Sequence, residues 1–195
     1  MLVCNANTGV SMIQDGTVTS SKIVDGSVTN TDLETPYRMV LGTAITASGT
    51  SVDFTGIPSW AKRITVMFNG VSTNGTSVPV IQLGDSGGIE NTNYNSNAVG
   101  ISAVTASVAY TTGFGISDNT AVGAAHSGNF NLSKLSENTY VLSGNTSFYP
   151  IGGGSKASVA AGSKTLSATL DRIRITTVNG TDAFDAGTIN IMYEG

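Results

Sequence analysis

The chain has 195 residues, of which 39% are hydrophobic and only 11% are charged, and its formal net charge is −4. Globular proteins usually have about 25% charged residues, and a negative net charge creates no basic field for nucleic acid or acidic lipid. The composition therefore excludes a nucleic-acid-binding protein. It favours an extracellular or virion-exposed structural protein, with one domain plus an appendage, over a cytosolic enzyme.

We expect neither a targeting signal nor a disulfide framework in this chain. Cys4 is the only cysteine, which excludes an intrachain disulfide and a cysteine-based zinc site. Residues 1–4 lead directly into polar sequence, and no apolar run is long enough to span a bilayer. We therefore expect that the protein does not reach a surface by the ordinary secretory route, and we expect it to need no cofactor.

A ten-residue repeat follows. The segment 15–24, Asp-Gly-Thr-Val-Thr-Ser-Ser-Lys-Ile-Val, continues in register as 25–34, Asp-Gly-Ser-Val-Thr-Asn-Thr-Asp-Leu-Glu. Each unit places valine (Val18, Val28) and a later aliphatic residue (Ile23, Leu33) at the same phase. A repeat that buries one face needs stacked neighbours, and one chain offers too few apolar side chains. We therefore expect copies of the chain to wind together into a stem, with a disordered Ser/Thr linker as the alternative.

The repeat ends at Pro36, because proline restricts the preceding residue and cannot donate to a strand ladder. The predicted domains are thus a stem over residues 1–36 and a head over 37–195. The head is predicted to be almost wholly β, with these strands: Arg38–Ala47, Thr50–Phe54, Arg63–Asn69, Val78–Leu83, Ser107–Ile116, Gly128–Ser133, Thr139–Phe148, Lys164–Leu170, Arg172–Thr176 and Thr188–Tyr193.

Alternation supports several of these strands. In the segment 63–69, isoleucine, valine and phenylalanine are expected to point to one side of the strand, and polar residues and Met67 to the other side. The segments 172–176 and 188–193 alternate in the same way. Asn-Gly pairs at 69–70, 74–75 and 179–180 supply turns between strands. Many short strands with close turns indicate an all-β sandwich or jelly roll.

Two parts of the chain resemble bacteriophage tail proteins. The repeats around Asp-Gly-Thr-Val-Thr and Asp-Gly-Ser-Val-Thr look like those of tail-fibre shafts. The segment 52–64 (Val-Asp-Phe-Thr-Gly-Ile-Pro-Ser-Trp-Ala-Lys-Arg-Ile) and the ending 187–194 (Gly-Thr-Ile-Asn-Ile-Met-Tyr-Glu) are similar to a carboxyl-terminal tail-fibre module. The resemblance implies a parallel homotrimer with a short intertwined β-helical stem and a jelly-roll-like head at the host-contacting end of the virion.

The sequence gives little support for a catalytic function. His126 is the only histidine and lies among small residues without a nucleophile elbow. It is expected at the surface or in an interface, and on a trimer axis it is a minor candidate for binding a metal or anion. Asp182 and Asp185 are expected to hold a turn rather than to hydrolyse a glycan. We expect no enzyme and no metal site.

Two further acidic segments have structural interpretations. Asp53 is expected to pair with the basic residues Lys62 and Arg63. The segment 85–91, which begins at Asp85, is rich in oxygen ligands but lacks the spacing of an EF-hand loop. An ordinary solvated loop is the preferred interpretation of it.

Loops on a rigid β scaffold are better candidates for recognition. Tyr94 and Asn95 lie in a polar stretch, 84–105, that suits stacking on a sugar and hydrogen bonding to its hydroxyls. Tyr149, before the glycine run at 152–154, has the same potential. The alternative is that these aromatic rings plug the ends of the sandwich or pack between subunits. Trp60 is expected to cover the core.

The sequence thus predicts a trimeric tail-fibre or tail-tip protein whose head adsorbs to a bacterial surface glycan or outer-surface protein. Other copies of itself and other tail components are its expected partners. A purely architectural module that trimerises or caps the fibre is the first alternative. A glycan depolymerase is the second.

Overall fold

The computed structural model describes residues 3–4, 11–12, 18–34, 37–101, 105–149, 154 and 156–195. Contacts divide the chain into two units, Met1–Arg38 and Met39–Gly195, and this boundary lies two residues beyond the predicted one. In the described part of the chain, no helix is long and apolar enough to cross a membrane.

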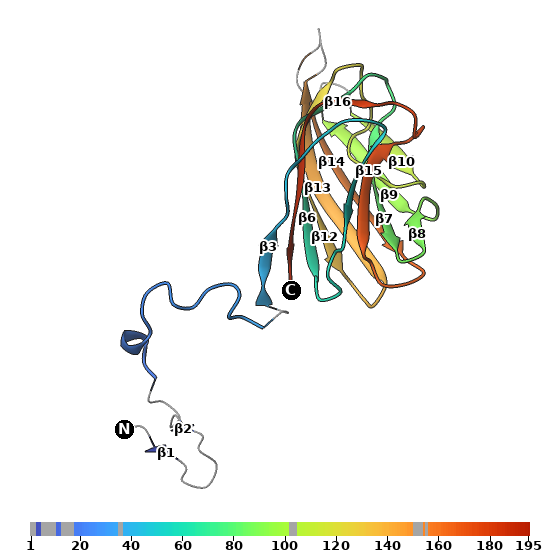
Figure 1. The fold of residues 1–195 in the computed structure, drawn as a ribbon. Coiled ribbons are helices and arrows are strands. Elements are labelled where there is room, and N and C mark those ends of the chain that lie inside the picture. The colour runs from blue at the N-terminus through green and yellow to red at the C-terminus, as the bar shows by residue number, and fades with distance from the viewer. Residues whose placement is uncertain are drawn as a thin grey trace. The chain divides into compact units, whose positions relative to one another are not determined.

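The described residues of the first unit contain little regular structure (Figure 1). β1 (Val3–Cys4) pairs with β2 (Ser11–Met12), and Ser20–Lys22 forms a 3-10 helix, η1. Residues 18–34 form no strand in this single chain. The intertwined β-helical stem therefore remains a prediction about an assembly of several chains.

The sequence repeat is also a repeat of local structure. The hydroxyl of Thr19 lies 3.0 Å from that of Ser21, and ten residues later the hydroxyl of Thr29 lies 2.7 Å from that of Thr31. The predicted stem-core residues are all exposed in the single chain: Val18 by 50%, Ile23 by 44%, Val28 by 57% and Leu33 by 40%.

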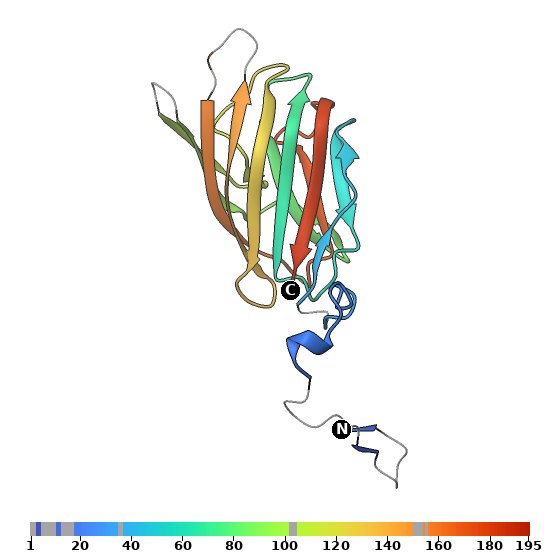
Figure 2. The ribbon, with the colours of Figure 1, turned by 90° about the vertical axis from the view of Figure 1, so that its left-hand side faces the viewer.

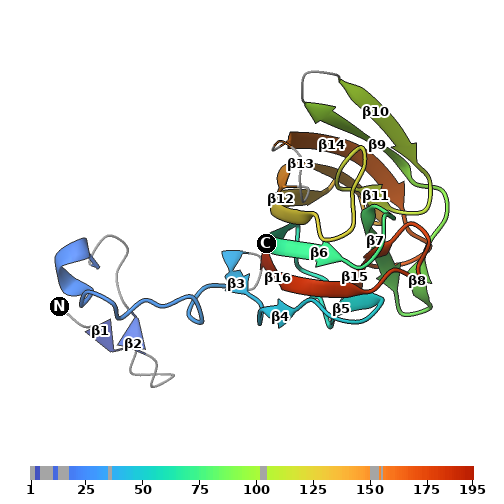
Figure 3. The same ribbon diagram turned by 90° about the horizontal axis from the view of Figure 1, so that it is seen from above.

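The head is all-β and consists of two antiparallel sheets packed face to face (Figure 1, Figure 3). The larger sheet follows the order β10-β9-β14-β13-β12-β6-β16-β3, and β4 adds to β16. Its strands are β3 (Met39–Leu41), β4 (Ile45–Thr46), β6 (Arg63–Thr73), β9 (Asn95–Ile101), β10 (Ala106–Tyr110), β12 (Ala125–Lys134), β13 (Thr139–Tyr149), β14 (Lys156–Thr165) and β16 (Phe184–Glu194).

The smaller sheet follows the order β11-β7-β15-β5, with β8 paired to β7. Its strands are β5 (Ser51–Thr55), β7 (Pro79–Asp85), β8 (Gly88–Glu90), β11 (Phe114–Gly115) and β15 (Arg172–Thr177). Figure 2 looks onto the outer face of the larger sheet, with the smaller sheet behind it.

The core lies between the sheets, where the predicted alternation places it. Ile64, Val66 and Phe68 of β6 are all buried, as are Ile173 and Ile175 of β15. The ring of Phe68 meets that of Phe130 edge-on across the β6 and β12 pair, at 6.1 Å between centroids. The alternation prediction is confirmed for these strands.

Strands with small inward residues were harder to predict. The stretch 84–105, expected as a loop, contains β8 and β9, and the strand expected at Lys164–Leu170 is instead β14, which ends at Thr165. The inward positions of β9 and β14 include Ala98, Ser158 and Ala160. Because these side chains are small, the sequence lacks the large apolar alternation on which strand prediction depends.

Candidate functional site

Tyr94, predicted as a receptor contact, lies in the core. Its side chain is 4% exposed, and its ring meets that of Phe114 edge-on at 5.0 Å between centroids. The hydroxyl accepts a 2.7 Å hydrogen bond from the backbone N–H of Leu83 and donates to the carbonyl of Glu90 at 2.9 Å. A buried ring offers no surface for stacking a sugar, which corrects the prediction for this residue.

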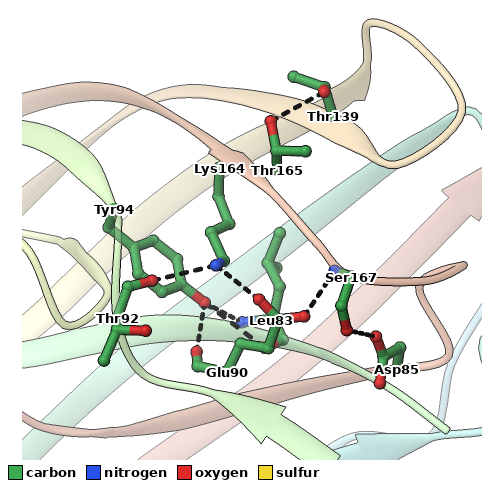
Figure 4. A network of polar contacts seen from close by, with 9 residues as sticks. All are labelled: Leu83, Asp85, Glu90, Thr92, Tyr94, Thr139, Lys164, Thr165 and Ser167. Carbon is green, nitrogen blue, oxygen red and sulfur yellow. Dashed lines mark hydrogen bonds and ion pairs between the residues drawn. The ribbon is translucent and has the colours of Figure 1, made fainter. Parts of the chain in front are cut away.

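The ring of Tyr94 also lies against a buried lysine (Figure 4). Lys164 is 3% exposed, and its ammonium group is 5.3 Å from the centroid of the Tyr94 ring. Its Nζ donates to the carbonyl of Thr92 at 3.0 Å and pairs with the carboxylate of Glu90 at 2.6 Å. The positive charge is therefore satisfied inside the protein.

The carboxylate of Glu90 extends this network toward the smaller sheet (Figure 4). It accepts a 2.7 Å hydrogen bond from the N–H of Ser167, whose hydroxyl donates to Asp85 at 2.7 Å. Burial acts to raise the pKa of Glu90, but the hydrogen bonds from Lys164 and Ser167 outweigh it and lower the pKa. The network joins β14 of the larger sheet to β7 and β8 of the smaller one, which indicates a structural role.

His126, expected at the surface or in an interface, is 1% exposed. Its ring stacks on Phe148 at 5.1 Å between centroids, and its Nε2 lies 3.1 Å from the hydroxyl of Thr120. Burial lowers the pKa of the imidazole to about 4, so the ring is neutral at pH 7. A buried ring does not face copies of itself across a symmetry axis, which corrects that prediction.

The acidic residues considered for catalysis have structural partners. Asp182 accepts a 2.8 Å hydrogen bond from the N–H of Ser77 and a 2.7 Å bond from the side-chain amide of Asn179. Asp185 accepts a hydrogen bond from the hydroxyl of Ser72. Asp182 holds a loop, as expected from the sequence, whereas Asp185 lies on β16 and links this strand to Ser72 of β6.

The ion pair predicted for Asp53 forms with a different partner. Asp53 accepts two 2.7 Å hydrogen bonds from Arg174, which is its neighbour across the β5 and β15 register. Arg63 instead pairs with Glu194 at 2.5 Å. The prediction of a structural ion pair holds, but the partner residues were wrong, because strand register decides which side chains meet.

The remaining sequence candidates divide between the core and the surface. Trp60 packs on the core and contacts the ring of Tyr193 edge-on at 5.7 Å. Asn95, at the start of β9, is exposed, and Tyr149, at the end of β13, is 62% exposed. In the described part of the chain, no group of three or more His, Cys, Asp or Glu side chains is arranged to hold a metal ion.

A polar groove of about 300 Å³ crosses the outer face of the smaller sheet. We define it by six of its lining residues: Ser51, Gln82, Asn91, Thr112, Arg174 and Asn179. Gln82 and Arg174 are register partners on β7 and β15, which places them side by side although they are far apart in sequence. The sequence gave no signal for this groove, because its residues come together only through strand pairing and loop placement.

Hydrogen bonds fix the floor of the groove and leave its rim open. The amide nitrogen of Gln82 donates to the carbonyl of Thr112 at 2.8 Å, and Arg174 is held by Asp53. Within the described chain, the side chains of Asn91 and Ser51 have no hydrogen-bond partner. The groove thus offers fixed donors and acceptors, and the charge of its arginine is balanced.

These groups suit a neutral ligand with many hydroxyls. Amides and hydroxyls both donate and accept, and the compensated charge of Arg174 gives no preference for an anion. The volume of about 300 Å³ lies at the lower end of the range for small-ligand sites, about 300–1,000 Å³. The groove therefore has the volume of a small-ligand site and a lining of mixed donors and acceptors.

Comparisons of the chain with protein-family models, with curated proteins and with solved structures found no match.

Proposed function

We propose that this protein is a structural component of a bacteriophage tail, a fibre or tail-tip protein that attaches the virion to a bacterial surface. The phased repeat, whose apolar residues are exposed in the single chain, supports self-association through an intertwined β-helical stem. The trimeric state and the jelly-roll-like class of the head are parts of the proposal that come from the resemblance to tail-fibre proteins. Other tail components are the further partners.

The observation that carries the binding role is the polar groove. Ser51, Gln82 and Arg174 lie on strands, so the sheet holds this part of the groove and little order is lost there when a ligand binds. Amides, hydroxyls and an arginine whose charge is balanced by a carboxylate form hydrogen bonds with the hydroxyls of a neutral glycan. We therefore place the receptor segment, a neutral bacterial surface glycan, in this groove.

The head binds its receptor without cleaving it in this proposal. Glycoside hydrolysis uses a pair of carboxyl groups on either side of the scissile bond. Asp182 and Asp185 are engaged by backbone and side-chain donors, and Asp53 is engaged by Arg174. These contacts support binding rather than hydrolysis.

The test uses the full chain, fluorescently labelled, on arrays of purified bacterial surface polysaccharides. We expect saturable binding to a neutral polysaccharide, at least tenfold weaker in the double variant Ser51→Ala, Asn91→Ala. Asn119→Ala is the matched control, because Asn119 is exposed and does not line the groove. Reducing ends are measured in parallel, and their release by the wild-type chain would contradict a non-catalytic role.

Tyr149 supplies a second candidate contact, since its ring is 62% exposed. Loss of binding in Tyr149→Ala, with binding retained in the groove variant, would move the receptor site to that end of the head. If the wild-type chain binds no polysaccharide and no bacterial cell in a broad panel, the architectural alternative replaces the receptor-binding proposal.

A further inference from the structure

The outer face of the larger sheet has no charged residue over most of its extent. Figure 2 looks onto the strands of this face. Their register arranges the outward side chains in rows that cross β6, β12, β13, β14, β9 and β10. One row consists of Met67, Asn129, Asn145, Val159, Val99 and Ser107. The next consists of Thr65, Asn131, Ser143, Ala161, Asn97 and Ala109.

Two shorter rows flank these. On one side lie Ser127, Ser147, Ala157 and Ile101, and on the other lie Ser133, Val141, Ser163 and Asn95. We call these four rows the neutral face. The nearest charges in register are Arg63 and Glu194, which pair with each other beyond Ser133 at the border of the face.

Only 11% of the residues of the chain are charged, so twenty positions of average composition would carry about two charges, and the neutral face carries none. The head has charged residues on other surfaces. Asp53 and Arg174 lie on the smaller sheet, and Glu137 lies in an exposed turn. The neutral face is therefore lower in charge than the rest of the head, which itself has few charged residues.

We propose that the neutral face is covered by further copies of this chain. The inference rests on the self-association in the proposed function and assigns it a surface in the head. Interface cores are depleted in charged residues, because charges are costly to remove from water. Side chains on this face are mainly Asn, Ser, Ala, Thr and Val, which lose little conformational freedom when covered.

The size of the face agrees with this occupant. Each outward position covers about 4.8 Å across the strands and about 6.8 Å along them, so the twenty positions cover about 650 Å². A standard-size protein interface buries about 600–1,000 Å² on each partner. Val159, Val141 and Ile101 are 43%, 37% and 53% exposed in the single chain and supply apolar contacts within the face.

A second copy of the chain is also the partner that the rest of the molecule favours. A neutral face gives no attraction to a charged partner, whereas another head offers a surface of the same kind. The repeat independently requires copies of the same chain, and attachment to an associated stem raises the local concentration of heads. The four rows contain no tryptophan or tyrosine on which a sugar would stack, and the exposed ring of Tyr149 lies two residues beyond Ser147, outside the neutral face.

The test measures protection of an introduced thiol in the full chain, with Cys4→Ser as background because Cys4 is the only cysteine. Ser143→Cys places the thiol at the centre of the neutral face, and Thr55→Cys places it at an exposed strand position of the smaller sheet. Labelling with a maleimide at about 10 µM chain is followed by mass spectrometry, and light scattering gives the mass of each sample. We expect an oligomer in which Ser143→Cys reacts at least tenfold more slowly than Thr55→Cys.

Adding Val159→Glu is expected to restore fast labelling of Ser143→Cys, since a charge would have to be buried between copies. Val122→Glu, at a 53% exposed position outside the face, is the matched control and should leave the labelling slow. Equal rates for Ser143→Cys and Thr55→Cys in an oligomer, or a monomeric mass for the full chain, would overturn the inference. Slow labelling that persists with Val159→Glu would overturn it too. Failure to bind any polysaccharide would remove the proposed receptor but not this interface.

Discussion

At the scale of single residues, burial sets the protonation state of a side chain, which the residue type alone does not determine. His126 is an imidazole that burial keeps neutral, with a pKa of about 4 against an ordinary value of 6.5. Since the folded-state value is lower, the unfolded chain takes up the proton first when the pH falls. The contribution to stability is complete above about pH 6.5 and is lost as the pH falls toward about 4.

We therefore expect the free energy of unfolding to fall by about 1 kcal/mol between pH 7 and pH 5.5 because of His126. His126→Gln removes the titration while keeping a side chain able to hydrogen-bond with Thr120. Urea unfolding at the two pH values measures the difference, in a range where carboxyl groups titrate little. An equal loss in both proteins would assign the pH dependence to other groups.

The pair of Lys164 with Glu90 supplies a second prediction at this scale. Lys164 is 3% exposed, and removing its countercharge leaves a buried ammonium group without compensation. We expect Glu90→Gln to lower the free energy of unfolding by about 3 kcal/mol. Glu194→Gln is the matched control, because its partner Arg63 has a side chain that is 55% exposed, and it should cost much less. If Glu90→Gln lowers the free energy of unfolding as little as the control does, the carbonyl of Thr92 alone compensates the charge of Lys164.

At the scale of strands, backbone irregularities fix where the sheet bends. The pairing of β16 with β6 shifts register near Gly187, which adopts φ +92°. A Cβ at this position would lie 2.5 Å from the carbonyl of Gly70 and 2.5 Å from the Cα of Val71. Glycine is therefore required here both by backbone conformation and by the close approach of β6.

We expect Gly187→Ala to destabilise the head by at least about 2 kcal/mol more than Gly180→Ala. Gly180 also has positive φ, +68°, but a Cβ there would meet nothing within 4 Å. Gly180→Ala therefore measures the cost of placing alanine at positive φ, and the additional loss in Gly187→Ala measures the cost of the steric clash. Thermal unfolding of both variants measures the difference, and equal shifts in Tm would mean that β6 moves aside without cost.

At the scale of the whole molecule, the repeat predicts association. The mass of the full chain in solution is expected to be three times 19.8 kDa. Ile23→Asp combined with Leu33→Asp should weaken association, because both residues occupy the apolar phase of the repeat. Val24→Asp is the control, since Val24 is outside that phase and 75% exposed. Equal effects of the in-phase and out-of-phase changes would leave the repeat without a role in assembly.

The fold was predictable where large side chains alternate with polar ones. Ile64, Val66 and Phe68 identified β6, and Ile173 and Ile175 identified β15, because a sheet buried on one face imposes a period of two. Strands β9 and β14 escaped prediction, since Ala98 and Ala160 give little hydrophobic contrast. The candidate site was not predictable. Tyr94 lies in a polar segment that resembles a binding loop in composition, yet its ring packs inside the sandwich.

The sequence alone indicates that the head is all-β, locates the strands in which large apolar side chains alternate with polar ones, and shows that residues 15–34 repeat with a period of ten. These are local properties, because alternation, turn residues and repeat phase act over a few neighbouring positions. Which side chains meet, by contrast, depends on the tertiary structure. The pairing of Asp53 with Arg174, the polar groove beside Gln82 and the rows of the neutral face all depend on strand register. Register is set by the packing of distant segments, so no local pattern contains it.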